Sequence, residues 1–573
     1  MQDHRDFAVS GLLDTPRAGA ELSETLPTCL GGANYGARST PKVESPSMVP
    51  ETDVCLIVEG GYPYVQGGVA SWMDALIRAS ASLKFHVIAI SVSSQPRLKK
   101  FVVPDNVIAV TDVIIDLCAA GRTPTARDAQ CISRGVRLMQ TVISGNPGTS
   151  FQELIELVRQ TGFGQAALLD SRVAWTAMER AYSELLPDGP LLDFFWSWRF
   201  LARSLLAVVN TPLPNPRVFH AVSTGYAGLV GAYAKYVTKR PYIVTEHGIY
   251  TNERRIELSV ADWIFDPDAS GFTVGDTPAK LRDRWLAAFR SFSRISYALS
   301  DVITTQYRAN QEYQRSDGAP AHKLRIIPNG IDVDRYAGLG HGTAPRPPTV
   351  LMIGRIVPIK DTHTFIAAVS LLAELVPNVV AIIIGPEDED PAYAAGCRGL
   401  VAQLGLESTI QFLGRVPDVT EYLGRADVIA MTSISEAQPI ALLEAAATGL
   451  PAVTTDVGSC REIIEGFEDD PVIGHGGIVV HACDPKATAQ ALATILLDDE
   501  KRTEMGRIMQ QRIRNLYHKD RVRRLYENLY AELARELPVE SGQADAEEVR
   551  SWKARSNRAG WLWSGKRKPI RYA

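Results

Sequence analysis

The sequence lacks the features that stabilise an extracellular or membrane-spanning protein. Its 573 residues include only seven cysteines, an odd and widely scattered set with no C-x-x-C pair and no histidine at ligand spacing. This argues against both a disulfide scaffold and a zinc site. No stretch approaches the length of uncharged apolar residues that a membrane span needs, and the opening residues contain acids where a secretory signal would be apolar. We therefore expect a protein of the reducing cytoplasm. The cysteines are Cys29, Cys55, Cys118, Cys131, Cys397, Cys460 and Cys483.

An excess of positive charge is also missing. The formal net charge is −5, which argues against a nucleic-acid partner held by bulk electrostatics. A chain of this length is too long for one hydrophobic core. We therefore expect two sizeable domains with appendages.

The first half of the chain reads as an α/β domain over residues 51–335. VCLIVEGG predicts a buried strand that enters a glycine loop, and Gly67 and Gly68 open a helix. Strand signals vanish between about 117 and 213, where long amphipathic stretches predict a helical insertion. The α/β rhythm resumes with strands that end near His220 and His247.

The second half repeats this order over residues 349–537, after a Gly- and Pro-rich linker at 336–348. We therefore predict two Rossmann-like domains in series. Residues 1–50 have the composition of a disordered arm. Residues 538–573 form a charged tail, which we interpret first as solvated and second as a contact for anionic lipid headgroups or a partner.

Two cations follow the first strand of the second half. PTVLMI predicts a buried strand, and Arg355 and Lys360 come directly after it in GRIVPIK. Ligands of open parallel sheets bind at the carboxyl ends of strands. Arginine offers a two-pronged donor and lysine a mobile point charge, which together suit a diphosphate.

Two acids follow later in SEAQPIALLEAAATG, where Pro439 predicts a helix start. This places Glu436 in the loop before the helix and Glu444 inside it. A helix N-terminus, here Pro439, Ile440 and Ala441, also stabilises phosphate through its free N–H groups. Either motif alone is weak, but their joint occurrence in this order predicts a site for a nucleotide diphosphate attached to a sugar.

These second-half motifs, with IIIGPED and IQFLGRVPDV, resemble those of retaining glycosyltransferases with the GT-B fold, in glycosyltransferase family 4. EGGYPYVQGGVASWMDALI and PYIVTEHGIYTNERRIE, with the insertion, further resemble the PelF group of Pel exopolysaccharide biosynthesis. The resemblance covers about 50–535. It implies two Rossmann-like domains that face a cleft, and a hexosyltransferase that moves a sugar from a UDP-sugar, UDP-glucose or a UDP-N-acetylhexosamine, to a growing exopolysaccharide of a biofilm.

The resemblance also implies roles for individual residues. Arg355 and Lys360 match the family's phosphate-binding cations. Glu436 matches the acid at the donor sugar, and Glu444 the acid that binds the ribose. Backbone N–H groups of the glycine loop at Gly67 and Gly68 contact the diphosphate from across the cleft.

His247 in TEHG matches the cleft histidine, with donation of a hydrogen bond or shaping of the sugar pocket as its expected role; His220 is more often a packing residue. Arg415 is expected on the nucleotide side. Aromatic faces stack on sugar rings, so Tyr64, Trp72 and Tyr250 are candidate acceptor contacts, although core packing explains each nearly as well.

The resemblance implies a metal-independent reaction without a cofactor. EDEDP, with Asp388 and Asp390, is the only close acidic pair with the look of a metal motif, and a solvated loop explains it better. We expect retention through a front-face substitution, in which the departing UDP phosphate helps to deprotonate the acceptor hydroxyl. A membrane-embedded export or synthase complex is the expected partner, which would bring the protein to the inner face of the cytoplasmic membrane.

Two rival interpretations stay open. UDP-sugar epimerases also pair two Rossmann-like domains around UDP, but they need no acceptor. A nucleotide-sugar-binding subunit with weak or no catalysis in a membrane polysaccharide complex is the second rival. The intact set of cations and acids disfavours the latter, because a decayed site would have lost at least one of them.

Overall fold

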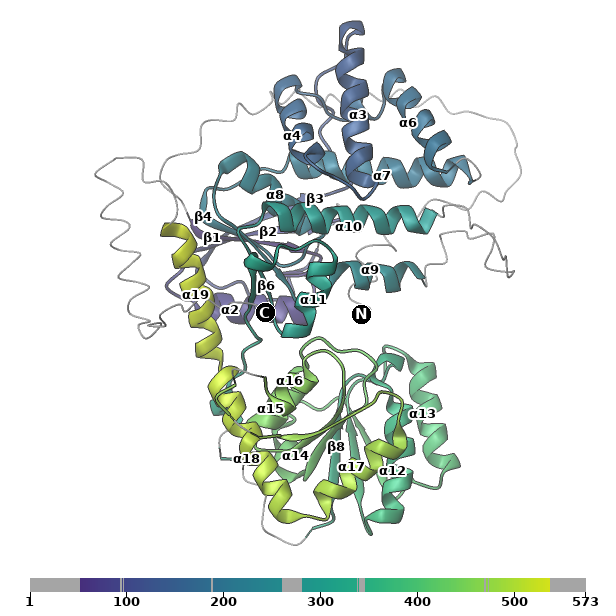
Figure 1. Cartoon of the computed structure of the whole chain (residues 1–573), viewed down its shortest axis with the longest axis vertical. Helices are drawn as coiled ribbons and strands as arrows, with labels where there is room; N and C mark the ends of the chain where they lie inside the picture. The colour runs from purple at the N-terminus through teal and green to yellow at the C-terminus, as the bar shows by residue number, and fades with distance from the viewer. Residues whose placement is uncertain are drawn as a thin grey trace, which may run out of the picture.

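The computed structural model describes residues 52–535, except 93–94, 96, 187–188, 260–280, 337, 340–345, 468–469 and 473. The described chain forms two α/β domains, one above the other, with a further group of helices at the far end of the first domain (Figure 1). The predicted arm at 1–50, the tail at 538–573 and most of the linker at 336–348 lie outside the described residues.

The described part of the first domain contains a seven-stranded parallel sheet in the order β3-β2-β1-β4-β5-β6-β7. Its central strands are apolar runs buried on both faces, as expected for parallel strands between helical layers. The strands are β1 (Thr52–Glu59), β2 (Phe85–Ser91), β3 (Val107–Ile114), β4 (Pro216–Ala221), β5 (Tyr242–Glu246), β6 (Val302–Thr305) and β7 (Leu324–Ile326).

Helices cover both faces of this sheet. One face packs on α8, α10 and the insertion, and the other on α2 and α19. The helices of this domain outside the insertion are α2 (Gly68–Ala79), α8 (Tyr226–Thr238), α9 (Tyr250–Ser259), α10 (Leu281–Leu299) and α11 (Arg308–Ser316).

The second domain repeats the plan with six described strands in the order β10-β9-β8-β11-β12-β13. They are β8 (Thr349–Ile353), β9 (Val380–Ile384), β10 (Ile410–Gly414), β11 (Val428–Met431), β12 (Ala452–Thr455) and β13 (Gly477–Val480). The helices are α12 (Thr362–Leu375), α13 (Pro391–Gln403), α14 (Thr420–Arg425), α15 (Ile440–Ala447), α16 (Cys460–Glu465), α17 (Pro485–Leu496) and α18 (Asp499–Leu516). The predicted pair of Rossmann-like domains is therefore confirmed.

Both sheets reverse their strand order at one point. In the first, β1 pairs with β2 on one side and β4 on the other; in the second, β8 pairs with β9 and β11. Loops that leave neighbouring strands at such a reversal diverge to opposite faces and leave a crevice between them. The loops after β1, β4, β8 and β11 are therefore where a ligand site is expected.

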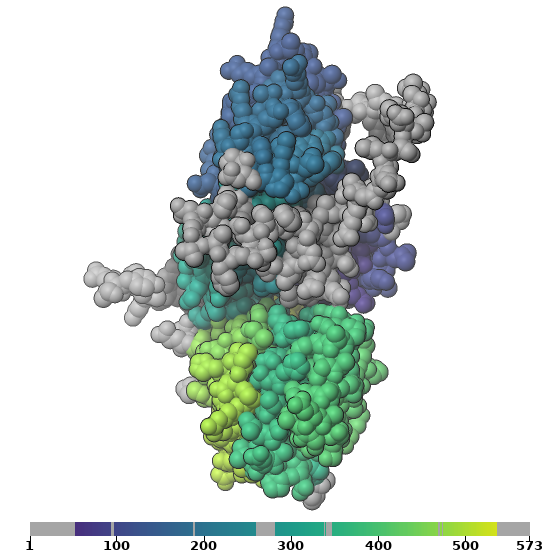
Figure 2. Space-filling model, turned by 90° about the vertical axis from the view of Figure 1, so that its right-hand side faces the viewer, coloured from purple at the N-terminus to yellow at the C-terminus, as the bar shows by residue number. Residues whose placement is uncertain are grey.

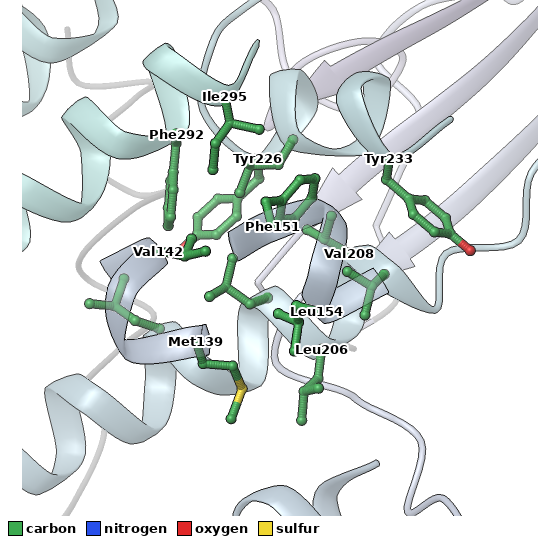
Figure 3. Close-up of a cluster of buried hydrophobic side chains, with 14 of the residues drawn as sticks. Met139, Val142, Phe151, Leu154, Leu206, Val208, Tyr226, Tyr233, Phe292 and Ile295 are labelled. Carbon is green, nitrogen blue, oxygen red and sulfur yellow. The ribbon is translucent and has the colours of Figure 1, made fainter. Parts of the chain in front are cut away.

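The helical insertion was predicted, and its described helices pack on α8 and α10, which cover one face of the first sheet. Met139 and Val142 of α3, Phe151 of α4 and Leu206 of α7 join Phe292 of α10 in one buried cluster (Figure 3). The insertion therefore shares a core with the first domain. Its helices are α3 (Ala129–Ile143), α4 (Ser150–Thr161), α5 (Gln165–Leu168), α6 (Arg172–Leu185) and α7 (Leu191–Val209).

The last helix is placed differently from our prediction. We grouped the C-terminal helices with the second Rossmann-like domain over 349–537, but α19 (Lys519–Arg535) leaves that domain and packs on the first (Figure 1). Tyr526 and Tyr530 are fully buried with residues of β1, β2 and α2. The chain thus crosses between the domains twice, and the two crossings are hydrogen-bonded at Ile331, which donates to Tyr517 and accepts from Lys519.

The molecule is elongated, with the insertion at the opposite end from the second domain (Figure 2). Among the described residues, none of the helices combines the length and apolar character needed to cross a membrane.

Candidate active site

A cleft of about 460 Å³ lies between the two domains. The first domain contributes residues that follow β5 and β6, and the second contributes residues that follow β8, β11 and β12. Of the residues predicted from sequence, Arg355, Lys360 and Glu436 all line this cleft. The reversal in the second sheet brings together side chains that are far apart in the chain.

Arg355 leaves the carboxyl end of β8 and is held by the neighbouring loop. The N–H of Gly354 donates to Ile384 and that of Ile356 donates to Pro386, so backbone bonds fix the chain on both sides of the arginine. Its guanidinium Nη1 lies 2.5 and 2.6 Å from the two carboxylate oxygens of Glu389. The arginine is about one-third exposed, so it remains accessible from the cleft.

Lys360 ends a short 3₁₀ turn, Pro358–Lys360. The N–H of Ile434 donates to Ile359 and the Thr432 hydroxyl donates to Asp361, which ties this turn to the loop after β11. That loop carries Glu436, whose Oε1 lies 2.5 Å from Lys360 Nζ.

The Glu436 loop is also held from the other side. The hydroxyl of Ser433 donates to Glu436 Oε1 at 2.7 Å, and Ser459 N–H donates to the Ala437 carbonyl. Gly458 has φ +55°, and a Cβ there would lie 2.3 Å from the Ala437 oxygen. Glycine is therefore required for this close approach.

Helix α15 begins after Pro439 and carries Glu444, as predicted. Glu444 Oε1 accepts a 2.8 Å hydrogen bond from the Tyr336 hydroxyl. Burial raises the pKa of Glu444, and the Tyr336 donation opposes this. Glu444, Pro439, Ile440 and Ala441 are not among the residues that line the described cleft, and the Ile440 side chain is exposed.

A smaller pocket of about 110 Å³ adjoins the cleft within the first domain. Gly248 and Glu253 line both spaces. Gly67 and Gly68 form its rim at the N-terminus of α2, where no side chain caps the helix. A Cβ at Gly68 would meet no atom within 4 Å, so packing does not explain this glycine. The pocket is lined further by Glu59, His247, Tyr250 and Arg254.

Gln306, which the sequence gave no reason to select, orients His247. With its amide oxygen toward the imidazole, Gln306 accepts from Nδ1 at 3.0 Å and donates to the backbone oxygen of Glu246 at 2.9 Å. The proton on Nδ1 leaves Nε2 as an acceptor. Nε2 is buried without a protein partner, and burial lowers the pKa of His247 to about 3. His247 is therefore neutral with an acceptor at Nε2, which does not fit the hydrogen-bond donation that we expected; its place in the pocket lining leaves the shaping role as a prediction.

Two carboxyl groups, that of the buried Glu246 and that of the partly exposed Glu59, lie near His247. Burial raises the pKa of Glu246 to about 7, although hydrogen bonds from Tyr297 and Gln314 oppose the shift. Burial also raises the pKa of Glu59, which accepts from the Tyr226 N–H at 2.9 Å. Neither acid was selected from the sequence, because burial of a carboxylate depends on tertiary packing.

His220 has both ring nitrogens occupied. They lie 2.8 Å from the Tyr530 hydroxyl and 2.7 Å from Thr245 Oγ1. Burial, and the proximity of His247, lower the pKa of His220 to about 3. This environment agrees with the packing role that we favoured for His220.

The three candidate aromatic contacts lie in different places. Tyr250 lines the small pocket, and the Arg254 guanidinium carbon lies 5.0 Å from the centre of its ring. The Trp72 ring packs edge-on against His247, with 4.5 Å between ring centres. Tyr64 lies apart from both; its hydroxyl donates to Asp112.

The remaining predicted positions are peripheral. The Arg415 side chain is 73% exposed and lies 3.6 Å from Asp388, outside the described lining of the cleft. Asp390 caps α13 by accepting from the Tyr393 N–H. Within EDEDP, sequence reasoning therefore missed Glu389, the acid that contacts Arg355.

Two family models match this chain. Residues 52–322 match a family described as a domain of unknown function, DUF3492. Residues 340–512 match glycosyl transferases group 1. The second domain is therefore similar to glycosyl transferases group 1. Arg355, Lys360, Glu436 and Glu444 all lie within the matched residues.

The similar curated proteins are glycosyltransferases by name. The D-inositol 3-phosphate glycosyltransferase of Corynebacterium urealyticum is 27% identical over 248 residues, which is 40% of this chain and 56% of the relative. That of Corynebacterium efficiens is 34% identical over 170 residues, 29% of this chain and 38% of the relative. The chain thus spans between about two-fifths and three-fifths of the length of these relatives.

Solved structures share the fold at low identity. Anabaena Alr3699/HepE, in complex with UDP, is 14% identical with a TM-score of 0.51 over 84% of this chain and 100% of its own. Sucrose-phosphate synthase from Thermosynechococcus elongatus is 17% identical with a TM-score of 0.51 over 84% and 99%. The fold of this chain is GT-B, as predicted.

Proposed function

We propose that this protein is a retaining, metal-independent glycosyltransferase that moves a hexose from a UDP-sugar to a growing exopolysaccharide of the Pel type. One observation carries the proposal: two cations and an acid of the second domain, Arg355, Lys360 and Glu436, line one cleft opposite the His247 pocket of the first. The UDP in the similar Alr3699/HepE structure supports UDP as the nucleotide.

The donor occupies the cleft with its diphosphate on the two cations. Arg355 and Lys360 balance the charge that develops on the leaving group as the sugar–oxygen bond breaks. The uncapped N-terminus of α2 at Gly67 and Gly68 supplies backbone N–H groups from the first domain. Glu436 orients the sugar hydroxyls, and Glu444 holds the ribose, with Tyr336 fixing its carboxylate.

The transfer proceeds on one face of the sugar. The bond from the anomeric carbon to the β-phosphate oxygen breaks, and the acceptor oxygen bonds to the same face of that carbon. The acceptor proton passes to the departing phosphate, so the products are UDP and the lengthened glycan. No protein carboxylate forms a covalent intermediate in this scheme.

His247 contributes as a neutral ring that shapes the sugar pocket. Because its pKa is lowered to about 3, it carries no charge near neutral pH, and its buried Nε2 leaves the ring as a lining surface of the pocket. Tyr250 lines this pocket as an aromatic surface for a sugar ring, and Trp72 packs edge-on against His247 and supports its ring. The polysaccharide acceptor therefore enters from the first domain, and a membrane export complex at the cytoplasmic face receives the product.

The deciding experiment measures UDP release by the purified protein with UDP-glucose, UDP-N-acetylglucosamine and UDP-N-acetylgalactosamine in turn. An Arg355→Ala, Lys360→Ala double variant is the test, and Arg415→Ala is the matched control because its side chain lies outside the cleft. We expect release with one donor, abolished in the double variant and retained in the control.

Product analysis separates the rivals. An epimerase would convert the UDP-sugar without acceptor and release no polymer. A binding subunit would retain UDP without turnover of any donor. Absence of both UDP binding and turnover would overturn the donor assignment itself.

A further inference from the structure

The Arg355 guanidinium is paired with a carboxylate of the protein itself, that of Glu389. Glu389 places both carboxylate oxygens within 2.6 Å of one guanidinium nitrogen. The glutamate side chain is about one-fifth exposed and the arginine about one-third. The contact therefore forms at the edge of the cleft, where the arginine is accessible to a ligand.

The loop that carries Glu389 is built to present it. Gly385 donates to Gly414 of β10, and Pro386 accepts from Ile356, which anchors the start of the loop. A Cβ at Gly385 would lie 1.8 Å from the Gly354 oxygen, so the Glu389 loop and the Arg355 loop touch along their backbones. The end of the loop is anchored by Asp390, which caps α13.

The other acids of this loop have different partners. Glu387 binds Arg398 through two hydrogen bonds of 3.0 and 2.7 Å. Asp388 is about four-fifths exposed and only approaches Arg415. Among these loop acids, Glu389 alone contacts the cleft cation Arg355 in the described chain. The anchored ends of the loop hold Glu389 in this position.

We propose that Glu389 is a positioning and affinity-determining residue that occupies the place of a phosphate oxygen pair on Arg355. This rests on the proposed function, because it takes a nucleoside diphosphate as the ligand of Arg355. A carboxylate and a phosphate present the same pair of acceptors to a guanidinium. Glu389 engages one nitrogen of the guanidinium, so a bound diphosphate competes with it for that nitrogen, and the returning carboxylate favours departure of the UDP product.

The distinguishing consequence is a gain of affinity. Removing a side chain that merely supports the site weakens binding, whereas removing an internal competitor strengthens it. For a partly exposed ion pair, we expect Glu389→Gln to bind UDP about threefold to tenfold more tightly than the natural protein. Its turnover falls where UDP release limits the cycle.

The experiment is calorimetric titration of UDP into the full-length protein, Glu389→Gln and Asp388→Asn. Asp388→Asn is the matched control because it removes the same charge from the adjacent position without touching Arg355. We expect tighter binding in Glu389→Gln alone, with less than about a twofold change in the control.

Three outcomes decide the proposal. Tighter binding by Glu389→Gln alone supports it. Equal tightening in both variants overturns it, and so does unchanged or weaker binding in Glu389→Gln. In either case, UDP binding by the natural protein leaves the proposed function standing. Absence of UDP binding in all three proteins, each shown to be folded by its thermal transition, overturns the proposed function and this proposal with it.

Discussion

Lys360 Nζ lies 2.5 Å from Glu436 Oε1 across the floor of the cleft. The lysine that we assign to the diphosphate and the acid that we assign to the sugar thus neutralise each other, while both line the cleft. Arg355 with Glu389 repeats the arrangement at the neighbouring loop. Each of these two pairs is internally neutral, and under the proposed function a donor exchanges these internal partners for its own phosphate and hydroxyl groups.

Glu436→Gln should separate sugar handling from nucleotide binding. The variant keeps a similar shape but frees Lys360, so UDP affinity should hold or rise slightly. Turnover of the UDP-sugar should fall by about 100-fold, because the carboxylate that orients the sugar is lost. Titration with UDP and steady-state turnover measure the two effects. Glu421→Gln, which removes an exposed helix ion pair with Arg425, is the control; a parallel loss of UDP affinity and turnover would contradict the assignment.

Gln438 links the donor loop to the first domain. Its side-chain oxygen accepts from the Asn329 N–H at 2.5 Å, and its amide donates to the Gln306 carbonyl at 3.4 Å. Gln306 in turn orients His247. Gln438→Met removes both hydrogen bonds at a buried position. The Asn329 N–H is then unpaired, which lowers the free energy of unfolding by about 1–3 kcal/mol.

We expect Gln438→Met to lower turnover about tenfold while UDP affinity, supplied by the second domain, changes less than about twofold. Turnover and UDP titration on the same preparation measure this. Gln403→Met, on the exposed end of α13, is the control. Turnover equal to that of the natural protein would show that the link plays no part in assembling the site.

The site was predictable where its signals are local. The strand at β8 and the helix at α15 follow from apolar runs and from Pro439, and these elements fix Arg355 and Glu444 in place. The parallel α/β order then predicts which loops meet, because strand ends share one edge of a sheet. Composition and periodicity were sufficient for this level of detail.

Other features depend on contacts between distant segments. An acidic loop such as EDEDP gives no sign of which acid faces the cleft, because backbone bonds between the loops after β8, β9 and β10 decide it. The amphipathic pattern of α19 predicts that one face of the helix is buried, but it does not predict which element covers that face. In the structure, the face lies against the first domain. Gln306 has no motif at all; its role follows from its position after β6.

Removal of divalent metal should leave activity unchanged. The acids at the cation pairs are engaged, Glu436 by Lys360 and Glu389 by Arg355, and the cations supply the charge that a metal would supply to a diphosphate. Among the described residues, none of the His, Cys, Asp and Glu side chains gather in a group suited to hold a metal. Turnover should be equal in excess EDTA and in Mg²⁺ or Mn²⁺. Loss in EDTA with recovery in Mg²⁺ would show that a metal takes part.

His220 should contribute stability that depends on pH. In the folded protein its pKa is about 3, because burial disfavours the charged ring. In the unfolded chain the pKa of this histidine is about 6.5. Below that pH, the unfolded state binds a proton at His220 and the folded state does not. Stability from this residue is therefore present above about pH 6.5 and falls by about 1.4 kcal/mol per pH unit as the pH drops toward 3.

His220→Phe keeps the ring contact with Tyr526 but loses the bonds to Tyr530 and Thr245. We expect the variant to be about 2 kcal/mol less stable at pH 8. The difference should close as the pH falls to 5, because only the natural protein loses stability through this histidine. Urea unfolding at several pH values measures it, with exposed His322→Ala as the control. UDP affinity should be unchanged at pH 8, whereas a large loss of affinity there would place His220 in the site rather than beneath it.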